Sequence, residues 1–192
     1  ITLAVGHLSE LIMAFFNNGS KYGLKIEYSK EEKKLGTAGG LGLLKNKLVD
    51  DFLVMNGDVL TGLDFSEFLE FHKKTGSIAT IALNRRHVDI DFGVVELDEN
   101  RTLIGYIEKP KIDYLVSMGV YAFNESILEY IPSHEYLDIP DLMKRLLSEG
   151  EKVNGFIHDG YWLDIGRPDD YIKANEDIQK IYRELGVSID ET

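Results

Sequence analysis

The sequence has 192 residues, enough for one sizeable hydrophobic core, and we expect a single domain over residues 1–192. Its formal net charge is −12, it has no Lys- or Arg-rich run, and it has no cysteine, which argues against nucleic-acid partners, disulfides and thiolate metal sites. No apolar run approaches the roughly 18 residues of a membrane span and no signal peptide is seen, so we expect a cytoplasmic protein with no membrane partner.

The first half of the chain alternates strand patterns with helix patterns. Short apolar runs predict strands at residues 1–5, 24–29, 51–55 and 77–83. Helical periodicity predicts helices at residues 9–16 and 65–74, and it places Leu11, Ile12, Phe15 and Phe16 of the first helix in the core. This alternation indicates an α/β fold with a doubly wound, mainly parallel, Rossmann-like sheet.

An antiparallel element interrupts the alternation after residue 92. Residues 93–97 and 103–107 flank a polar turn at 98–100, which predicts an inserted hairpin. The remaining patterns predict a strand at 117–123, helices at 127–130 and 140–149, a strand at 153–158 and a helix from 168 to about 185.

Two aspartates are candidates for a metal site. Asp58 follows the predicted strand 51–55, and ligands of open α/β sheets bind beyond the carboxyl ends of strands. The alternative is that Asp58 only stabilises a turn, because Asn-Gly and Gly-Asp are common turn dipeptides. Asp164 lies between Leu163 and Ile165, where burial of a carboxylate would be costly unless a cation pairs with it.

Two further motifs have polar or glycine-rich patterns that suit a phosphorylated ligand. The glycines of residues 35–40 would let the backbone approach a base or a phosphate, although a tight loop leading into a helix explains them equally well. Glu108 and Lys109 place an acceptor beside a cation, as a sugar phosphate requires, with a solvated ion pair as the alternative. The five histidines show no metal-ligand spacing, and we assign them no role.

Read in order, these motifs resemble those of the sugar-1-phosphate nucleotidyltransferase family, which includes mannose-1-phosphate guanylyltransferases and glucose-1-phosphate thymidylyltransferases. The matching segments are LGTAG at 35–39, NGD at 56–58, FGVV at 92–95, EKP at 108–110, SMGVY at 117–121 and WLDIGRP at 162–168 with Tyr171. The resemblance reaches to about residue 180. The family's opening strand and Arg-bearing glycine-rich loop have no counterpart, so we expect an N-terminally truncated domain that lacks its first βαβ segment and is inactive alone. Its unpaired sheet edge would favour a homo-oligomer.

The resemblance implies a GT-A-like nucleotidyltransferase fold and a Mg²⁺-dependent reaction between a nucleoside triphosphate and a sugar 1-phosphate. An oxygen of the sugar 1-phosphate attacks the α-phosphorus in line, and pyrophosphate leaves. By the same resemblance Asp58, Asp164 and Lys109 are catalytic residues, and the two aspartates share the Mg²⁺, with carboxyl oxygens no more than about 8 Å apart. The resemblance also implies that Lys109 contacts the phosphate of the sugar 1-phosphate. Contacts to the sugar are implied for Gly93, Glu108 and Ser117, and contacts to the base for Glu31 and Gly36.

Two other classes of function stay open at this point. A non-catalytic regulatory or assembly module could keep the fold, and a metal-dependent glycosyltransferase also uses a nucleotide-sugar and strand-end carboxylates. Among nucleotidyl transfers, overall similarity favours guanylyl transfer to a mannose-like phosphate, with thymidylyl and cytidylyl transfer as alternatives.

Overall fold

The computed structural model describes residues 1–166, 168–176 and 182–183, and these form two compact units. Unit 1 comprises Ile1–Leu53, His72–Thr80 and Ala122–Asn154. Unit 2 comprises Val54–Phe71, Ile81–Tyr121 and the described residues from Gly155 onward. Each unit is therefore assembled from three separate stretches of the chain.

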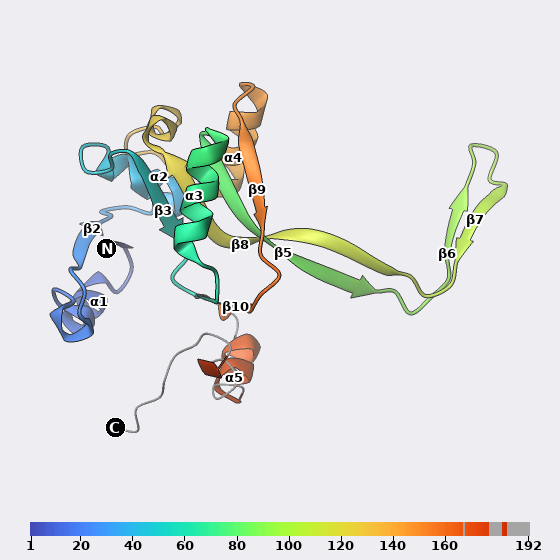
Figure 1. Ribbon diagram of the computed structural model, residues 1–192, viewed down its shortest axis with the longest axis horizontal. Coiled ribbons are helices and arrows are strands. Elements are labelled where there is room, and N and C mark those ends of the chain that lie inside the picture. Colours follow the sequence, from blue (N-terminus) through green and yellow to red (C-terminus); the bar gives the residue numbers. More distant parts are fainter. Residues whose placement is uncertain (167, 177–181, 184–192) are drawn as a thin grey trace. The chain divides into compact units, whose positions relative to one another are not determined.

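The elements follow the predicted alternation of strands and helices (Figure 1). Unit 1 contains β1 (Thr2–Val5), α1 (Ser9–Phe16), β2 (Glu27–Lys30), α2 (Gly36–Gly39), α4 (Ile139–Ser148) and the 3-10 helices Ser20–Tyr22, Gly40–Leu44 and Glu125–Tyr130. Unit 2 contains β4 (Val59–Thr61), β6 (Val94–Leu97), β7 (Leu103–Ile107), β10 (Trp162–Asp164) and α5 (Pro168–Glu176). The elements with residues in both units are β3 (Asp51–Met55), α3 (Phe65–Thr75), β5 (Ala79–Asp89), β8 (Lys111–Asn124) and β9 (Val153–Ile157).

The strands form one four-stranded sheet and three pairs. The four-stranded sheet has the order β3-β8-β5-β9. β1 and β2 pair in parallel, whereas β4 with β10 and β6 with β7 pair antiparallel. The α/β class with added antiparallel strands is confirmed. The predicted continuation of α5 to about residue 185 lies largely outside the described residues.

Helix α4 anchors the core of unit 1. Its buried side chains recur at helical spacing, with Leu142 and Leu146 wholly buried, so one face of the helix packs inward. Phe123 is also wholly buried, and its ring meets that of Phe52 edge-on with centroids 5.9 Å apart. Burying each such side chain contributes about 1.5 to 3 kcal/mol to folding. In unit 2, the ring of Phe68 packs edge-on against Phe156.

The prediction that α1 buries its four apolar residues is wrong. Leu11 and Phe15 are 66% and 70% exposed, because no described part of the chain covers that face of the helix. The apolar periodicity still gives a helix, and Phe15 and Phe16 contact each other edge-on. The sequence pattern showed which residues share a face and left open what that face packs against.

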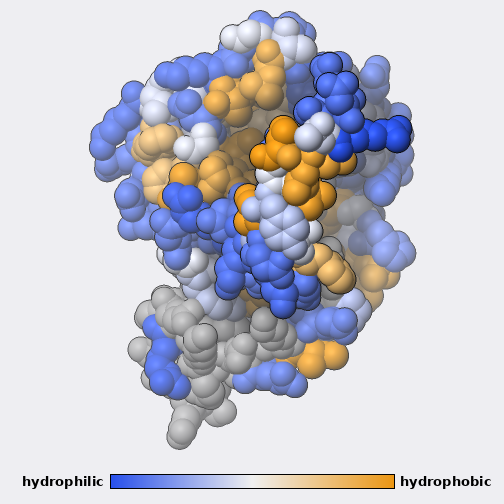
Figure 2. All heavy atoms as spheres, turned by 90° about the vertical axis from the view of Figure 1, so that its right-hand side faces the viewer, coloured by the Kyte–Doolittle hydropathy of each residue, from blue (hydrophilic) through white to orange (hydrophobic). Residues whose placement is uncertain are grey.

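The predicted insertion is an antiparallel hairpin. β6 pairs with β7 from Val94 opposite Ile107 to Leu97 opposite Leu103, with an irregularity next to Glu96. The turn forms because one carboxylate oxygen of Asp98 accepts two backbone hydrogen bonds, from Asn100 and Thr102. Most apolar residues of this hairpin are exposed. Figure 2 shows apolar side chains, coloured orange, among the atoms nearest the viewer.

Candidate active site

The strand pair β4–β10 brings Asp58 and Asp164 together in unit 2. Asp164 lies opposite Val59 in the antiparallel register, and the N–H of Ile165 donates to the carbonyl of Asp58 at 2.8 Å. Asp58 Oδ2 and Asp164 Oδ1 lie 2.8 and 3.0 Å from the single point that a Cβ on Gly166 would occupy. The two oxygens are therefore no more than about 6 Å apart, within the limit of about 8 Å expected for a shared Mg²⁺. We call Asp58 and Asp164 the carboxylate pair.

The donor set of the carboxylate pair fits a hard divalent cation. Mg²⁺ is usually held by one or two carboxylates plus waters and substrate phosphates, with ligands at about 2.1 Å. Both aspartates are exposed, and no Lys, Arg or His among the described residues pairs with either one. Larger clusters of three or more His, Asp or Glu suited to a metal are absent from the described residues. A cation here would thus need ligands from a bound substrate or from water.

The structure corrects the reason for singling out Asp164. Its neighbours Leu163 and Ile165 do not bury the carboxylate, because alternate residues of a strand point to opposite faces. The carboxylate is exposed and accepts a hydrogen bond from the N–H of Gly166 at 2.9 Å. Its position next to Asp58, rather than desolvation, makes it a candidate ligand.

Trp162 fixes the strand that carries Asp164. Its indole N–H donates to the carbonyl of Met118 at 3.0 Å, and the Arg86 guanidinium lies over the ring at 4.7 Å. Ser117 lies next to Met118 in β8, and its hydroxyl is 3.1 Å from Tyr121 Oη and accepts the N–H of Gly119. The hydroxyl of Ser117 thus makes its contacts within β8. The sugar contact of Ser117 stays a prediction.

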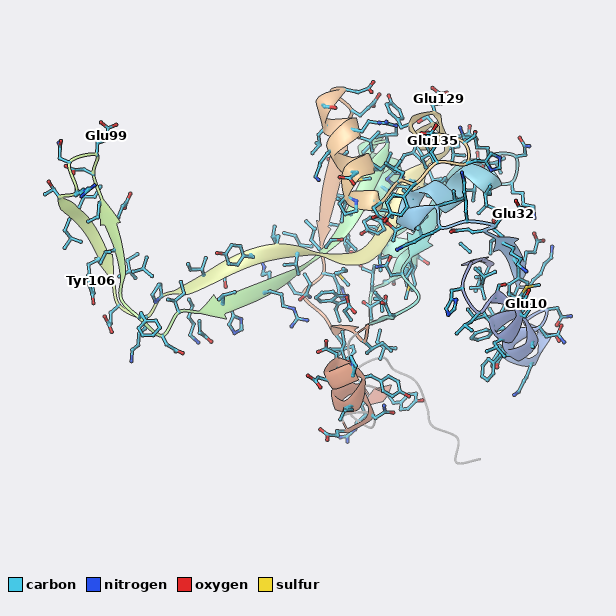
Figure 3. All side chains as sticks on the ribbon, turned by 180° about the vertical axis from the view of Figure 1, so that it is seen from behind. Glu10, Glu32, Glu99, Tyr106, Glu129 and Glu135 are labelled. Carbon is cyan, nitrogen blue, oxygen red and sulfur yellow. The ribbon has the colours of Figure 1, made fainter. Side chains whose placement is uncertain are left out.

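The hairpin brings Gly93 and Glu108 together through Tyr106. Figure 3 labels Tyr106 on the hairpin. The Tyr106 hydroxyl donates to Glu108 Oε2 at 2.8 Å, and it fills the space where a Cβ on Gly93 would lie. Lys109 is exposed at the end of the hairpin with a left-handed backbone, φ 46°. No described contact joins Lys109 to the carboxylate pair. Sequence reasoning missed Tyr106, because its contact with Gly93 depends on the pairing of β6 with β7.

The glycine-rich turn of unit 1 packs against the chain itself. Gly36 has φ +79°, and a Cβ there would lie 2.6 Å from the carbonyl oxygen of Leu137. The N–H groups of Ala38 and Gly39 donate to that same carbonyl, and the N–H of Thr37 donates to Asp138 Oδ1 at 2.9 Å. The alternative of a tight structural loop therefore explains these glycines, and the role of Gly36 toward a base stays a prediction.

Asp138 and Glu31 accept hydrogen bonds from the first residues of this turn. Asp138 accepts hydrogen bonds from the Tyr136 hydroxyl and from the backbone and hydroxyl of Thr37, and these donors lower the pKa of its carboxyl below the ordinary value. Glu31 Oε2 accepts the N–H of Leu35 at 3.1 Å. The carboxylate of Glu31 is thus bonded inside unit 1, and its role toward a base is untested.

The chain matches the family model described as Nucleotidyl transferase over residues 2–181, almost its entire length. The chain belongs to the nucleotidyl transferase family. A mannose-1-phosphate guanylyltransferase of Mycobacterium tuberculosis is 33% identical over 184 residues, which cover 93% of this chain and 51% of the relative. A UTP–glucose-1-phosphate uridylyltransferase of Synechocystis is 34% identical over 193 residues, covering 91% of the chain and 50% of the relative. The chain spans about half the length of these curated relatives.

Solved structures support the nucleotidyl transferase fold. HddC from Yersinia pseudotuberculosis superposes with a TM-score of 0.70 at 24% identity and covers 93% of this chain and 78% of its own. A glucose-1-phosphate thymidylyltransferase described as putative, from Bacillus anthracis, gives a TM-score of 0.71 at 22% identity over 100% of this chain and 78% of its own. At these identities the likeness establishes the fold. As to membrane segments, the described helices include none that is both long and apolar enough to span a bilayer.

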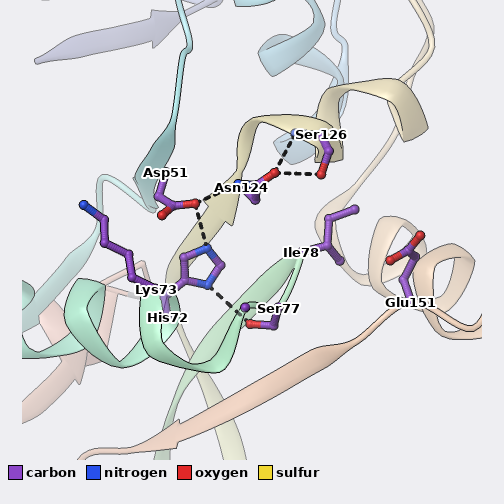
Figure 4. Close-up of a pocket in the computed structure, with 9 residues that line it drawn as sticks. Asp51, His72, Lys73, Ser77, Ile78, Asn124, Ser126 and Glu151 are labelled. Atoms are coloured by element: carbon purple, nitrogen blue, oxygen red, sulfur yellow. Dashed lines mark hydrogen bonds and ion pairs between the residues drawn. The ribbon is translucent and has the colours of Figure 1, made fainter.

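A polar cavity of about 350 Å³ in unit 1 contains none of the residues implied by the family motifs (Figure 4). Its wall includes His72, which is 1% exposed, with Nδ1 2.8 Å from Thr80 Oγ1 and Nε2 3.5 Å from Asp51 Oδ1. The same Asp51 oxygen accepts the amide N–H of Asn124 at 2.9 Å. Burial lowers the pKa of His72, although the Asp51 carboxylate opposes this, so the ring is neutral near pH 7. Sequence reasoning gave His72 no role, and the structure makes it a buried part of the fold.

Proposed function

We propose that this chain forms part of a sugar-1-phosphate nucleotidyltransferase, which converts a nucleoside triphosphate and a sugar 1-phosphate into a nucleoside diphosphate sugar and pyrophosphate. The observation that carries the proposal is the carboxylate pair in a member of the nucleotidyl transferase family: Asp58, which follows β3, and Asp164, the last residue of β10, are exposed and converge. Carboxylates at strand ends suit a phosphate-bound cation, because they supply hard oxygen ligands and leave the remaining positions to the substrate.

In the proposed reaction a phosphate oxygen of the sugar 1-phosphate forms a bond to the α-phosphorus. The bond from the α-phosphorus to the oxygen that bridges it to the β-phosphate breaks, and that oxygen takes the electron pair into pyrophosphate. Positioning and charge compensation carry such a transfer, and no covalent protein intermediate is needed. Mg²⁺, when bound, would neutralise charge that develops on the phosphates.

The chain's own residues would hold the reactants. Asp58 and Asp164 would bind the cation, and Lys109 would meet the phosphate of the sugar 1-phosphate as a point charge. Glu108, held by Tyr106, would accept hydrogen bonds from sugar hydroxyls. We also propose sugar contacts for Gly93 and Ser117, and base contacts for Glu31 and Gly36.

The named relatives narrow the substrates that are worth testing first. Mannose-1-phosphate guanylyltransferases and a glucose-1-phosphate uridylyltransferase are among them. We propose guanylyl transfer to a mannose-like phosphate as the first reaction to assay, followed by uridylyl, thymidylyl and cytidylyl transfer.

We further propose that residues 1–192 alone turn over slowly or not at all. The triphosphate brings several negative charges to a chain of net charge −12, and the Arg-bearing glycine-rich loop of the family has no counterpart in it. The phosphates would therefore have few cationic partners.

The test is a matrix of the common nucleoside triphosphates against several sugar 1-phosphates with Mg²⁺, with pyrophosphate and nucleotide-sugar both measured. It uses residues 1–192 alone and, in parallel, the full-length protein. Formation of both products in equal amounts by the full-length protein is the expected result. Glycosyl transfer from a nucleotide-sugar to an acceptor, without pyrophosphate formation from any pair, would contradict the proposal.

A further inference from the structure

Gly166 occupies the turn after β10, directly beside the carboxylate pair. Its N–H donates to Asp164 Oδ1 at 2.9 Å, while the preceding residue, Ile165, donates its N–H to the carbonyl of Asp58 at 2.8 Å. The backbone of this turn therefore holds both acidic residues from the same side.

A side chain at position 166 would enter the space between the two carboxylates. A Cβ there would lie 2.8 Å from Asp58 Oδ2 and 3.0 Å from Asp164 Oδ1, closer than nonbonded atoms normally approach. Gly166 is not one of the glycines with a positive φ, so the backbone conformation at this position does not demand glycine. Glycine is favoured at this position because the two carboxylates leave no room for a Cβ.

We propose that Gly166 is a positioning residue that keeps open the space in which the carboxylate pair receives a divalent cation, an inference that rests on the proposed function. A methyl group in this turn would push the Asp58 and Asp164 oxygens away from their present positions. It would also take volume that the cation and its waters need, since Mg²⁺ demands near-ideal ligand geometry. Because Gly166 is exposed and the Asp58 side chain can rotate away, we expect Gly166→Ala to fold and to bind cations more weakly.

The single tryptophan of the chain gives a readout that does not depend on catalysis. Trp162 lies two residues before Asp164 in β10, about 7 Å along the strand, so its fluorescence should be quenched by paramagnetic Mn²⁺ bound at the carboxylate pair. Mn²⁺ is titrated without nucleotide into the wild-type chain and each variant, and the quench is then reversed with Mg²⁺. Gly57→Ala is the matched control, because Gly57 adjoins Asp58 and a Cβ there meets nothing within 4 Å.

We expect Gly57→Ala to keep the wild-type midpoint, Gly166→Ala to raise it about tenfold or more, and Asp164→Asn to lose the Mg²⁺-reversible quench. A second measurement guards against a general folding defect: without metal, Gly166→Ala should lower the thermal midpoint less in an Asp58→Ala background than in the wild-type background, because the shorter of the two contacts is then absent. If Gly166→Ala kept the wild-type Mn²⁺ midpoint while Asp164→Asn lost the quench, the proposed role of Gly166 would be wrong and the cation site would still be supported. A wild-type chain without a saturable, Mg²⁺-reversible quench would overturn both.

Discussion

Replacement of Gly36 by alanine tests how the glycine-rich turn is held. Gly36 has φ +79°, and a Cβ on it would lie 2.6 Å from the carbonyl oxygen of Leu137 and 2.8 Å from Asp138 Oδ1. The change therefore carries two costs. The left-handed backbone costs a non-glycine residue about 1 to 2 kcal/mol, and the overlap adds about 1 to 3 kcal/mol.

Gly150 provides a control that separates these two costs. It has the same φ of +79°, it follows α4 in unit 1, and a Cβ on it would meet nothing within 4 Å. Gly150→Ala should therefore show the backbone cost alone. At about 2 to 4 °C per kcal/mol for a chain of this size, we expect its thermal midpoint to fall by about 2 to 8 °C and that of Gly36→Ala by about 4 to 20 °C.

The assay is urea and thermal unfolding of both variants, followed by far-ultraviolet circular dichroism. The informative quantity is the difference between the two variants, because the shared backbone term cancels. If Gly36→Ala were no less stable than Gly150→Ala, the turn would not pack against residues 137–138 as described, and the structural explanation of Gly36 would be refuted.

Three further predictions concern charge. Lys109→Ala in active full-length protein should raise the KM for the sugar 1-phosphate more than the KM for the nucleotide, by about 1.5 to 3 kcal/mol of binding, and equal effects on both would count against the assignment. Asp164→Asn should lower kcat/KM by about 100-fold or more without lowering the thermal midpoint, because the carboxylate is exposed; unchanged kinetics would remove it from the catalytic set. The pKa of His72 is lowered in the folded chain from its ordinary value of 6.5. When the pH is below 6.5, the unfolded chain therefore binds a proton at His72 more readily than the folded chain does, and the free energy of unfolding falls as the pH drops from 6.5 toward the folded pKa. The free energy of unfolding of the wild type should decrease by at most about 1.4 kcal/mol per pH unit in that window, and His72→Gln should show a smaller decrease; identical pH profiles would show that His72 does not titrate in this way.

Local patterns predicted most of the longer elements and the position of Asp58. The apolar run of β3 ends at Asn56, and the residues that follow it lie at a strand's carboxyl end, which is visible from five residues of sequence. The hairpin β6–β7 was equally clear, because two strand patterns flank a turn with its own side-chain acceptor, Asp98. These features depend on neighbours in the sequence.

The sequence did not reveal features that depend on contacts between distant residues. Thr37 and Asp138 are 101 positions apart, so packing of the glycine-rich turn against α4 could not be read from either segment. The exposed state of Asp164 and the open space at Gly166 follow from the pairing of β10 with β4, strands of three residues each that no periodicity identifies. The network around His72 also joins residues from β3, α3 and β5.

The fate of labelled phosphate tests the central claim most directly. Full-length protein is incubated with mannose 1-phosphate and GTP that carries the label in either the α- or the γ-phosphate, and then with the other nucleotide and sugar pairs. We expect that, for at least one pair, the α-label appears in the nucleotide-sugar and the γ-label in pyrophosphate, and that Asp164→Asn slows the appearance of both by about 100-fold or more. Release of the γ-label as inorganic phosphate with no labelled nucleotide-sugar from any pair would contradict nucleotidyl transfer.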